Sequence, residues 1–231
     1  MEEITICIVT FKKRLKLVQS LIDKIKNFYP DIQVLVAING ENEEGMDEEY
    51  RQKILTYIAS KNNVIPLMCT EHRCLAKLFN TMVTFSRTSY NLVLNDDILF
   101  DNPNVIEMVQ EAIEKTKLGL FFLNGNFSHF VICKELLHDL GYFDERFLAH
   151  GEEDGDFLWR YMNKYGEPIN SLYVDGLSNI GDYSEPTTNM KCHMTNKPLW
   201  NRMLMNEMYK SDESSTVQGW FGEKKIKNGQ D

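Results

Sequence analysis

The sequence lacks the cysteine pattern of a secreted disulfide framework. Its five cysteines are an odd number, and no two have CxxC spacing. Cys7 lies inside the apolar run ITICIV, where a buried, reduced thiol is expected. No basic leader or cleavage pattern accompanies that run, so no signal peptide is predicted. These features favour a reducing cytoplasm.

Long apolar runs are also missing. No stretch approaches the roughly 18 apolar residues that a membrane-spanning helix requires. We therefore expect a cytoplasmic protein, with any membrane association peripheral at the inner membrane surface. The net charge of −9 disfavours non-specific binding to nucleic acid or to anionic membranes. A local cationic pocket for a small ligand remains compatible with this charge.

Several catalytic motifs are absent. The chain has no GxxxxGK loop ending in Ser or Thr and no GxGxxG after a strand, which argues against a P-loop nucleotidase and a dinucleotide dehydrogenase. It also has no GxSxG elbow and no HExxH helix.

Short apolar runs alternate with helical patterns in the first half of the chain. The runs predict strands at 4–9, 33–38, 64–68 and 91–94, and helical spacing predicts helices at 12–27, 48–60 and 75–83. Strands that recur with a helix between them indicate right-handed βαβ units. The predicted fold class is therefore α/β, with a mostly parallel central sheet flanked by helices.

The second half is more mixed. It predicts a helix that begins near Asp101-Asn102-Pro103, strands at 119–123 and 129–133, and helices at 134–140, 154–165 and 198–210. No linker, repeat or low-complexity tract divides the chain. We therefore expect one domain over residues 1–231, with a polar tail at 211–231.

Two aspartates follow the fourth predicted strand directly. Ligands bind such sheets beyond the carboxyl ends of the strands, and Asn95-Asp96-Asp97 comes straight after NLVL. Carboxylates at that edge suit Mg²⁺ or Mn²⁺ held together with substrate phosphates. A solvated turn with an aspartate helix cap is the alternative.

Four acidic residues fall within five positions in the segment AHGEEDGDFLWRY, residues 149–161. Carboxylates in a first helical turn complement the helix dipole, which is the simplest explanation. Crowding of carboxylates also disfavours full ionisation and should raise at least one pKa.

Three segments, taken in order, resemble the GT-A glycosyltransferases, and most closely the inverting family 2 of nucleotide-sugar-dependent enzymes. They are the opening ITICIVTFKKRLKLVQSLIDKI, the aspartate pair in LVLNDD, and GYFDERFLAHGEEDGDFLWR. The third is similar to the acceptor-side pattern of that family, in which Gly-x-Phe-Asp-Glu precedes a Glu-Asp pair and a helix ending in Arg. The resemblance implies a single GT-A domain, with a nucleotide-sugar half at 1–100 and an acceptor half at 101–210.

The resemblance also implies roles for matching residues. Asp97, with Asp96, would bind a Mn²⁺ or Mg²⁺ cofactor and the nucleotide-sugar, and Asp154 would be the general base. The other implied positions are Thr10, Phe11, Arg14, Asn39, Lys77 and Asn80 for the nucleotide-sugar, Glu152, Glu153 and Trp159 for the acceptor, and His193 for the metal. Asn39 stands where the family commonly has an aspartate. Lys77 can equally be a solvated lysine, Trp159 a core residue and His193 a structural histidine.

The resemblance thus implies an inverting, metal-dependent enzyme that moves a sugar from a UDP-sugar to a saccharide hydroxyl. Three alternatives remain open: transfer to hydroxymethylated bases in phage DNA, sugar nucleotidyl transfer, and non-catalytic glycan binding. The acidic balance of the chain disfavours the first. The second usually needs a glycine-rich opening loop, which ITICIVTFKKR lacks. The oligomeric state is not predicted.

Overall fold

The computed structural model describes residues 3–11, 14–40, 47–148, 151–180 and 197–209. In chain order the elements are β1 (Ile4–Thr10), α1 (Leu15–Phe28), β2 (Val34–Ile38), α2 (Glu48–Ala59), β3 (Val64–Met68), α3 (Leu75–Phe85), β4 (Tyr90–Asn95), β5 (Ile98–Phe100), α4 (Val105–Thr116), β6 (Leu120–Leu123), β7 (Asn126–Cys133), α5 (Lys134–Leu140), α6 (Glu153–Tyr165), β8 (Asn170–Leu172), β9 (Leu177–Asn179) and α7 (Lys197–Tyr209).

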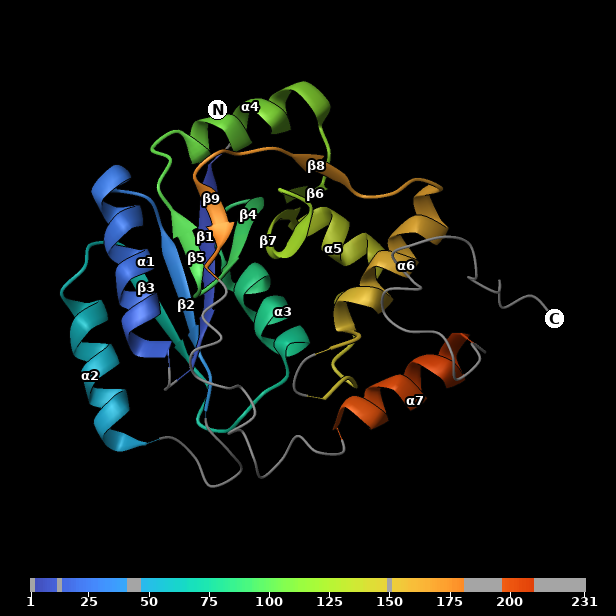
Figure 1. Ribbon diagram of the computed structural model, residues 1–231, viewed down its shortest axis with the longest axis horizontal. Coiled ribbons are helices and arrows are strands. Elements are labelled where there is room, and N and C mark those ends of the chain that lie inside the picture. The colour runs from blue at the N-terminus through green and yellow to red at the C-terminus, as the bar shows by residue number, and fades with distance from the viewer. Residues whose placement is uncertain (1–2, 12–13, 41–46, 149–150, 181–196, 210–231) are drawn as a thin grey trace.

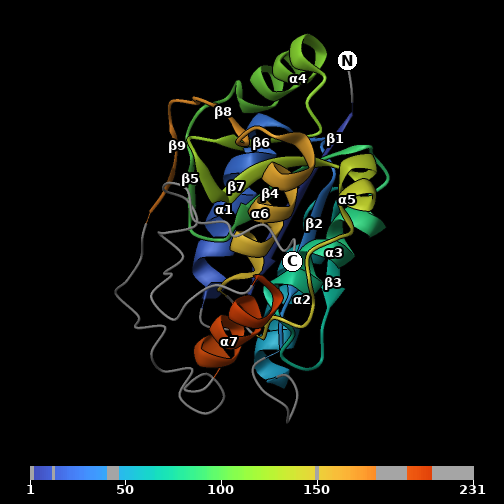
Figure 2. The same ribbon diagram turned by 90° about the vertical axis from the view of Figure 1, so that its right-hand side faces the viewer.

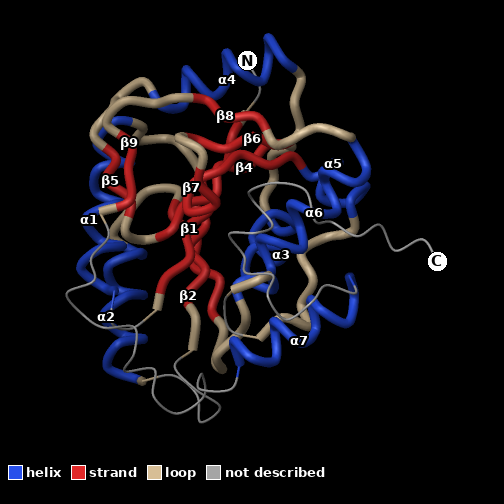
Figure 3. Tube along the Cα trace, turned by 45° about the vertical axis from the view of Figure 1, so that its right-hand side comes forward, coloured by secondary structure: helices blue, strands red, loops and turns tan. Residues whose placement is uncertain are grey.

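A seven-stranded sheet forms the centre, in the order β3-β2-β1-β4-β7-β6-β8. Neighbouring strands are parallel except at β7, which runs antiparallel to β4 and to β6. Figure 3 shows the strands as a central layer between helices. The mostly parallel sheet that the sequence predicts is confirmed.

Both faces of the sheet are apolar because helices cover both. On one face Ile4, Ile6 and Ile8 pack with α1, α2 and α4, and on the other Cys7 and Val9 pack with α3, α5 and α6. Strands buried on both sides read as continuous apolar runs, which is why the sequence reveals them. Cys7 is fully buried and its thiol is free, as expected.

The parallel strands all end at one edge of the sheet. Figures 1 and 2 show α4 at the end where β1 begins and α7 at the opposite end, where β1 finishes. The predicted ligand edge is therefore the α7 end of the molecule. None of the helices in the described ranges is both long and apolar enough to cross a membrane.

A two-stranded sheet of β5 and β9 was not predicted. Each strand has three residues, and they pair antiparallel through Ile98 and Asn179, Leu99 and Ser178, and Phe100 and Leu177. Strands this short carry no readable periodicity, and their partners are far apart in the sequence. β8, also three residues long, escaped prediction for the same reason.

Candidate functional site

Asp96 and Asp97 lie just beyond the end of β4, and both are buried. Thr10, the last residue of β1, donates a hydrogen bond from Oγ1 to Asp96 Oδ2 at 2.8 Å. Arg14 reaches across from the start of α1, with Nη1 at 3.2 Å from Asp96 Oδ1 and 2.6 Å from Asp97 Oδ2. The adjacent parallel strands β1 and β4 thus bring these four predicted residues together.

Burial dominates the electrostatics of this group. It raises the pKa of Asp96 to about 7, although the Arg14 charge and the Thr10 hydroxyl act to lower it. Burial also acts to lower the pKa of Arg14, but its hydrogen bond to Asp97 and the charge of Asp96 shift that pKa upward overall. Phe11 packs beside the guanidinium, with Arg14 Cζ 5.6 Å from the ring centroid. The loop after β1 therefore holds a fixed positive charge against two carboxyl groups.

The aspartate pair supplies oxygen ligands of the kind that bind a divalent cation. Asp97 Oδ1 is buried and has no hydrogen-bond partner in the described part of the chain. The pair can carry two negative charges against the single charge of Arg14. Among the described residues no group of three or more His, Cys, Asp or Glu could hold a metal.

The predicted metal ligand His193 lies outside the described residues, so its role stays a prediction.

Asn39, just after β2, links the loop that follows β2 to the 69–74 loop at the same edge of the sheet. Its Nδ2 donates to Arg73 O at 2.8 Å, and its Oδ1 accepts from Arg73 N at 2.8 Å. Gly40 packs so closely on Glu71 that a Cβ would lie 2.4 Å from the Glu71 carbonyl carbon, and glycine alone leaves that space. These two bonds give Asn39 a structural role in this structure, whether or not it also contacts a nucleotide base.

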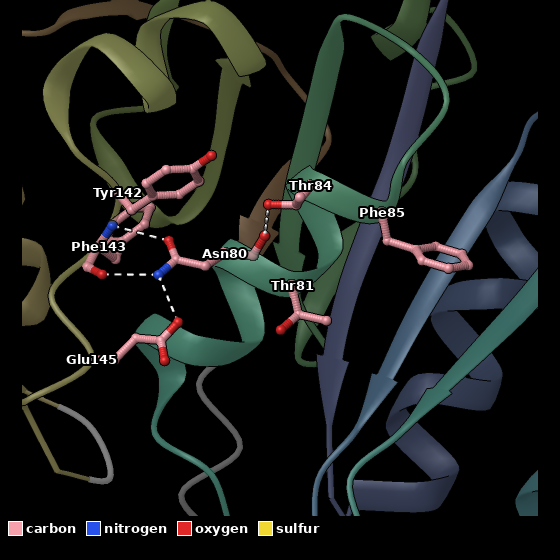
Figure 4. A pocket seen from close by; sticks show the side chains of 7 residues that line it. All are labelled: Asn80, Thr81, Thr84, Phe85, Tyr142, Phe143 and Glu145. Atoms are coloured by element: carbon pink, nitrogen blue, oxygen red, sulfur yellow. Dashed lines mark hydrogen bonds between the residues drawn. The ribbon is translucent and has the colours of Figure 1, made fainter.

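Lys77 and Asn80, on α3, contact the segment after α5, and Figure 4 shows the contacts of Asn80. Lys77 Nζ forms an exposed ion pair with Glu145 at 3.2 Å. Asn80 Nδ2 donates to Phe143 O at 2.8 Å and to Glu145 Oε1 at 3.1 Å, while Oδ1 accepts from Phe143 N at 3.0 Å. A cavity of about 750 Å³ adjoins Asn80, rimmed by Phe85 and Tyr142. In this structure Asn80 joins α3 to the segment that leads to the acidic residues.

The acidic segment begins with an unusual turn. Gly151 and Glu152 have φ values of 97° and 74°, and the second is a left-handed conformation that residues other than glycine adopt at a cost. Glu152 and Glu153 are buried, and Asp154 is partly exposed. Asp154 Oδ1 accepts from Gly155 N at 2.9 Å. The turn therefore concentrates three consecutive carboxyl groups at the start of α6.

Glu153 shows the strongest effect of this crowding. Burial, followed by the nearby Asp154 carboxylate, raises the pKa of Glu153 to about 8, and Glu153 Oε2 has no hydrogen-bond partner in the described ranges. The pKa of Glu152 is also raised by burial, with Arg202 opposing the shift. The sequence-based expectation that at least one pKa in this group is raised agrees with both directions.

Asp156, the fourth acidic residue, has a different environment. It is fully buried and receives Arg160 Nε at 3.0 Å and Arg160 Nη2 at 2.7 Å, together with the Tyr209 hydroxyl. Trp159 packs against Tyr209, with ring centroids 4.1 Å apart, in a small core that includes Phe147. Asp156 and Trp159 thus both connect α6 to α7. The Trp159 ring packs against Tyr209 of α7.

The 69–74 loop contacts both the Asn39 loop and the segment that leads to α6. Cys74 Sγ lies 3.7 Å from Glu145 O, and the charges of Glu145 and Glu153 both act on the Cys74 thiol. Arg73, which directly precedes Cys74, forms two backbone hydrogen bonds with the Asn39 side chain. The 69–74 loop therefore links the end of β2 to the segment before α6, within the electrostatic reach of Glu153.

Sequence reasoning missed His129, which is buried on β7 opposite Leu94 of β4. Burial lowers the pKa of His129, and the Asp97 charge opposes that shift, so the two side chains are electrostatic neighbours. A signal was present: a histidine stands inside the otherwise apolar strand that ends in HFVIC.

Comparison with known proteins agrees with this architecture. Residues 56–185, more than half of the chain, match the profile of the family described as Glycosyltransferase like family 2. Among curated protein sequences none matches significantly.

Solved structures with this fold are distant in sequence. The crystal structure of S. aureus TarS 1–349 is 13% identical with a TM-score of 0.58, over 76% of this chain and 59% of that one. The mannosyltransferase PcManGT from Pyrobaculum calidifontis, in complex with GDP-Man and Mn²⁺, is 12% identical with a TM-score of 0.56, over 75% and 55%.

Glucosyl-3-phosphoglycerate synthase from Mycobacterium tuberculosis, with Mn²⁺, UDP and glucosyl-3-phosphoglycerate, is 11% identical with a TM-score of 0.56, over 77% and 72%. The chain therefore spans less than two thirds of TarS 1–349 and of PcManGT.

Proposed function

Because the chain belongs to the Glycosyltransferase like family 2, we propose that it transfers a sugar, with inversion, from a nucleoside-diphosphate sugar to a saccharide hydroxyl. UDP is the nucleotide we expect, since TarS 1–349 and the glucosyl-3-phosphoglycerate synthase were both solved with UDP. The comparisons support the reaction class, and the residues at the sheet edge support the individual roles.

The donor side is assigned to Thr10, Arg14, Asp96 and Asp97. Asp97 and Asp96 would hold Mn²⁺ or Mg²⁺, which when bound offsets negative charge on the leaving diphosphate. Arg14 adds a permanent positive charge at the same place, fixed by its contacts to both carboxyl groups. A guanidinium held in this way can also contact phosphate oxygens.

The acceptor side is assigned to the start of α6. Asp154 would take the proton from the acceptor hydroxyl as its oxygen attacks the anomeric carbon opposite the departing diphosphate. Glu153, with its raised pKa, would hold a proton near neutral pH. A neutral Glu153 removes one like charge beside Asp154, which favours the ionised Asp154 that a base requires.

One chain of contacts supports the proposal: Asn39 N donates to Thr10 O, and Thr10 Oγ1 donates to Asp96. Asn39 links the end of β2 to Arg73, and the adjacent Cys74 lies within the electrostatic reach of Glu153. Donor and base groups at one edge of a parallel sheet match the place where such sheets bind ligands.

Calorimetry with UDP or GDP, with and without Mn²⁺, tests the donor side. We expect UDP to bind the wild type more tightly with Mn²⁺, and Asp97→Asn to lose about tenfold or more of that affinity, since an amide is a weaker ligand than a carboxylate. Asp101→Asn, at an exposed aspartate paired with Lys24, is the matched control. Equal UDP binding by Asp97→Asn and wild type in Mn²⁺ would remove Asp97 from the site.

A further inference from the structure

A second concavity adjoins the aspartates, on the side of β4 away from the Asn39 loop. It is a groove of about 520 Å³ between β5, β9 and the turn that joins β6 to β7, and its lining includes Leu99, Asn126, His129, Tyr173 and Ser178. Figure 1 shows β5 and β9 in front of the central sheet, and Figure 2, turned by 90°, shows them to its left. β5 starts at Ile98, and Ile180 N donates to Asp97 O at 2.8 Å, so the groove begins where the aspartate pair ends.

His129 is the deepest polar group in this groove, with 2% of its surface exposed. On one side Nδ1 pairs with Ser128 Oγ at 2.7 Å. On the other side Nε2 is buried and has no partner among the described residues. A buried polar atom without a partner costs stability, and such atoms in native proteins are usually completed by water or a ligand.

The rim of the groove combines an aromatic ring with polar side chains. Tyr173 is 74% exposed, which is unusual for an aromatic residue, and Asn126 and Ser178 are exposed beside it. A sugar ring presents apolar C–H faces and many hydroxyls, so it needs an aromatic surface together with amide, hydroxyl or imidazole partners.

Asn124 fixes this rim before any ligand arrives. Its Nδ2 donates to Val174 O at 2.9 Å and to Leu177 O at 2.7 Å, and its Oδ1 accepts from Val174 N at 2.7 Å. These three bonds hold the segment that carries Tyr173 against the β6–β7 turn. A groove that is already formed binds a ligand without the entropic cost of ordering a loop.

We propose that this groove is a saccharide subsite in which a sugar hydroxyl pairs with His129 Nε2, Asn126 bonds a second hydroxyl, and the ring packs on Tyr173. The proposal rests on the glycosyl transfer proposed above and names the place of one reacting sugar. A hydroxyl both donates and accepts, so it can pair with Nε2 in either imidazole tautomer. The sugar belongs either to the donor or to the acceptor.

The cavity beside Asn80 does not offer the same chemistry. The Asn80 amide is satisfied by Phe143 and Glu145, as Figure 4 shows, and no unpaired buried polar atom lies on that lining. Its exposed ring, Phe85, is 56% exposed and therefore supplies a matched control for Tyr173.

The test compares Tyr173→Ala, His129→Leu and His129→Gln with wild type and Phe85→Ala, each with a thermal melt to check folding. Calorimetry measures binding of UDP and of a panel of sugar nucleotides (UDP-glucose, UDP-galactose, UDP-N-acetylglucosamine and GDP-mannose), all with Mn²⁺. Saturation-transfer NMR measures binding of the methyl glycosides of glucose, galactose, mannose and N-acetylglucosamine, with and without UDP.

We expect Tyr173→Ala and His129→Leu to bind UDP as wild type does but to lose about tenfold in affinity for a sugar-bearing ligand, comparable to one lost contact. His129→Gln should restore part of it, and Phe85→Ala should change nothing. A loss on the sugar nucleotide assigns the groove to the donor sugar, and a loss only on a free glycoside assigns it to the acceptor.

Other results overturn the proposal. If the variants bind every sugar as wild type does, or if wild type binds none of them, the groove is not a saccharide subsite. If His129→Leu loses UDP binding in Mn²⁺, His129 belongs to the nucleotide and metal site instead. Failure of wild type to bind UDP would contradict the proposed function separately, and the free glycosides would still test the groove.

Discussion

Two groups of buried acidic residues, the Asp96–Asp97 pair and the residues at the start of α6, differ in the positive charges that lie close to them. Asp96 and Asp97 share one cation, Arg14, and a hydroxyl from Thr10. Glu153 is as deeply buried, yet its environment is dominated by burial and by the neighbouring Asp154 carboxylate. Both groups combine buried carboxyl groups with an oxygen that has no hydrogen-bond partner in the described residues, at Asp97 Oδ1 and Glu153 Oε2.

This difference in nearby positive charge indicates two different chemical roles. Carboxyl groups set against a fixed cation are arranged for a further charge, because Arg14 keeps them in position and leaves room for one more positive partner. Carboxyl groups set against each other tend to share protons, since two like charges at close range oppose joint ionisation. On this basis the first group suits a leaving diphosphate with its cation, and the second suits proton transfer.

Asp154→Asn is expected to give the largest effect and tests the proton-transfer half of the comparison. An amide cannot take up the acceptor proton, so turnover should fall by about 10²- to 10⁴-fold. UDP binding in Mn²⁺ should stay close to wild type because the donor group is unchanged. The measurement is UDP release from whichever sugar nucleotide the wild type turns over, with binding followed by calorimetry.

Asp31→Asn, at an exposed aspartate before β2, is the control for that substitution. Near-normal turnover by Asp154→Asn would contradict the proposed role. Joint loss of turnover and UDP binding would show that the two acidic groups are not separable in the way described.

Asp156→Asn addresses the acidic residue of the segment that forms an ion pair with Arg160. Its carboxylate is fully buried against Arg160, which is partly exposed, and the Tyr209 hydroxyl. Removing one partner of a buried pair is costly, and with Arg160 partly solvated we expect a loss of about 2–3 kcal/mol in the free energy of unfolding. Urea denaturation followed by circular dichroism measures this loss.

The matched comparison is Asp144→Asn, where the partner Arg146 is 63% exposed. Exposed pairs contribute little, so that variant should lose less than about 1 kcal/mol. Equal losses for the two variants would show that Asp156 is not a structural anchor of α6.

The sequence predicts the frame of the molecule well because the frame depends on apolar runs. β1, β2, β3 and β4 are continuous apolar segments, and the helices between them carry apolar side chains at helical spacing. The grouping of Thr10 and Arg14 with the two aspartates follows from the adjacency of β1 and β4. The βαβ pattern predicts that these strands are parallel but does not predict that they are neighbours.

The rest of the site depends on contacts between distant segments. Asn39 and Asn80 are small polar residues in the sequence, and only the fold reveals that Arg73, Phe143 and Glu145 occupy their amides. The groove around His129 needs β5 and β9, two three-residue strands that carry no pattern. Crowding in the acidic segment was predictable, but the turn at Glu152 decides which carboxyl groups are buried.

Glu153→Gln is expected to act only through the pH dependence of stability, and it tests whether the Glu153 carboxyl group, which has no cation paired with it in the described residues, holds a proton. The pKa of Glu153 in the folded state is raised from 4.5 to about 8, so the folded protein binds a proton that the unfolded chain releases. Protonated Glu153 therefore contributes its full stabilisation at pH values below its ordinary pKa of 4.5. This contribution is lost as the pH rises through the folded pKa of about 8. Wild-type stability should therefore fall as the pH rises from the ordinary pKa of 4.5 to the folded value of about 8.

The Gln variant does not titrate, so its advantage over wild type should increase from about pH 5 to about pH 8, measured by urea denaturation at several pH values. Glu135→Gln, at an exposed position on α5, should instead run parallel to wild type. Parallel curves for Glu153→Gln and wild type would mean that Glu153 is already ionised at neutral pH. The acidic segment would then have to tolerate adjacent charges as the aspartate pair does, through a cation that reaches it from elsewhere in the chain.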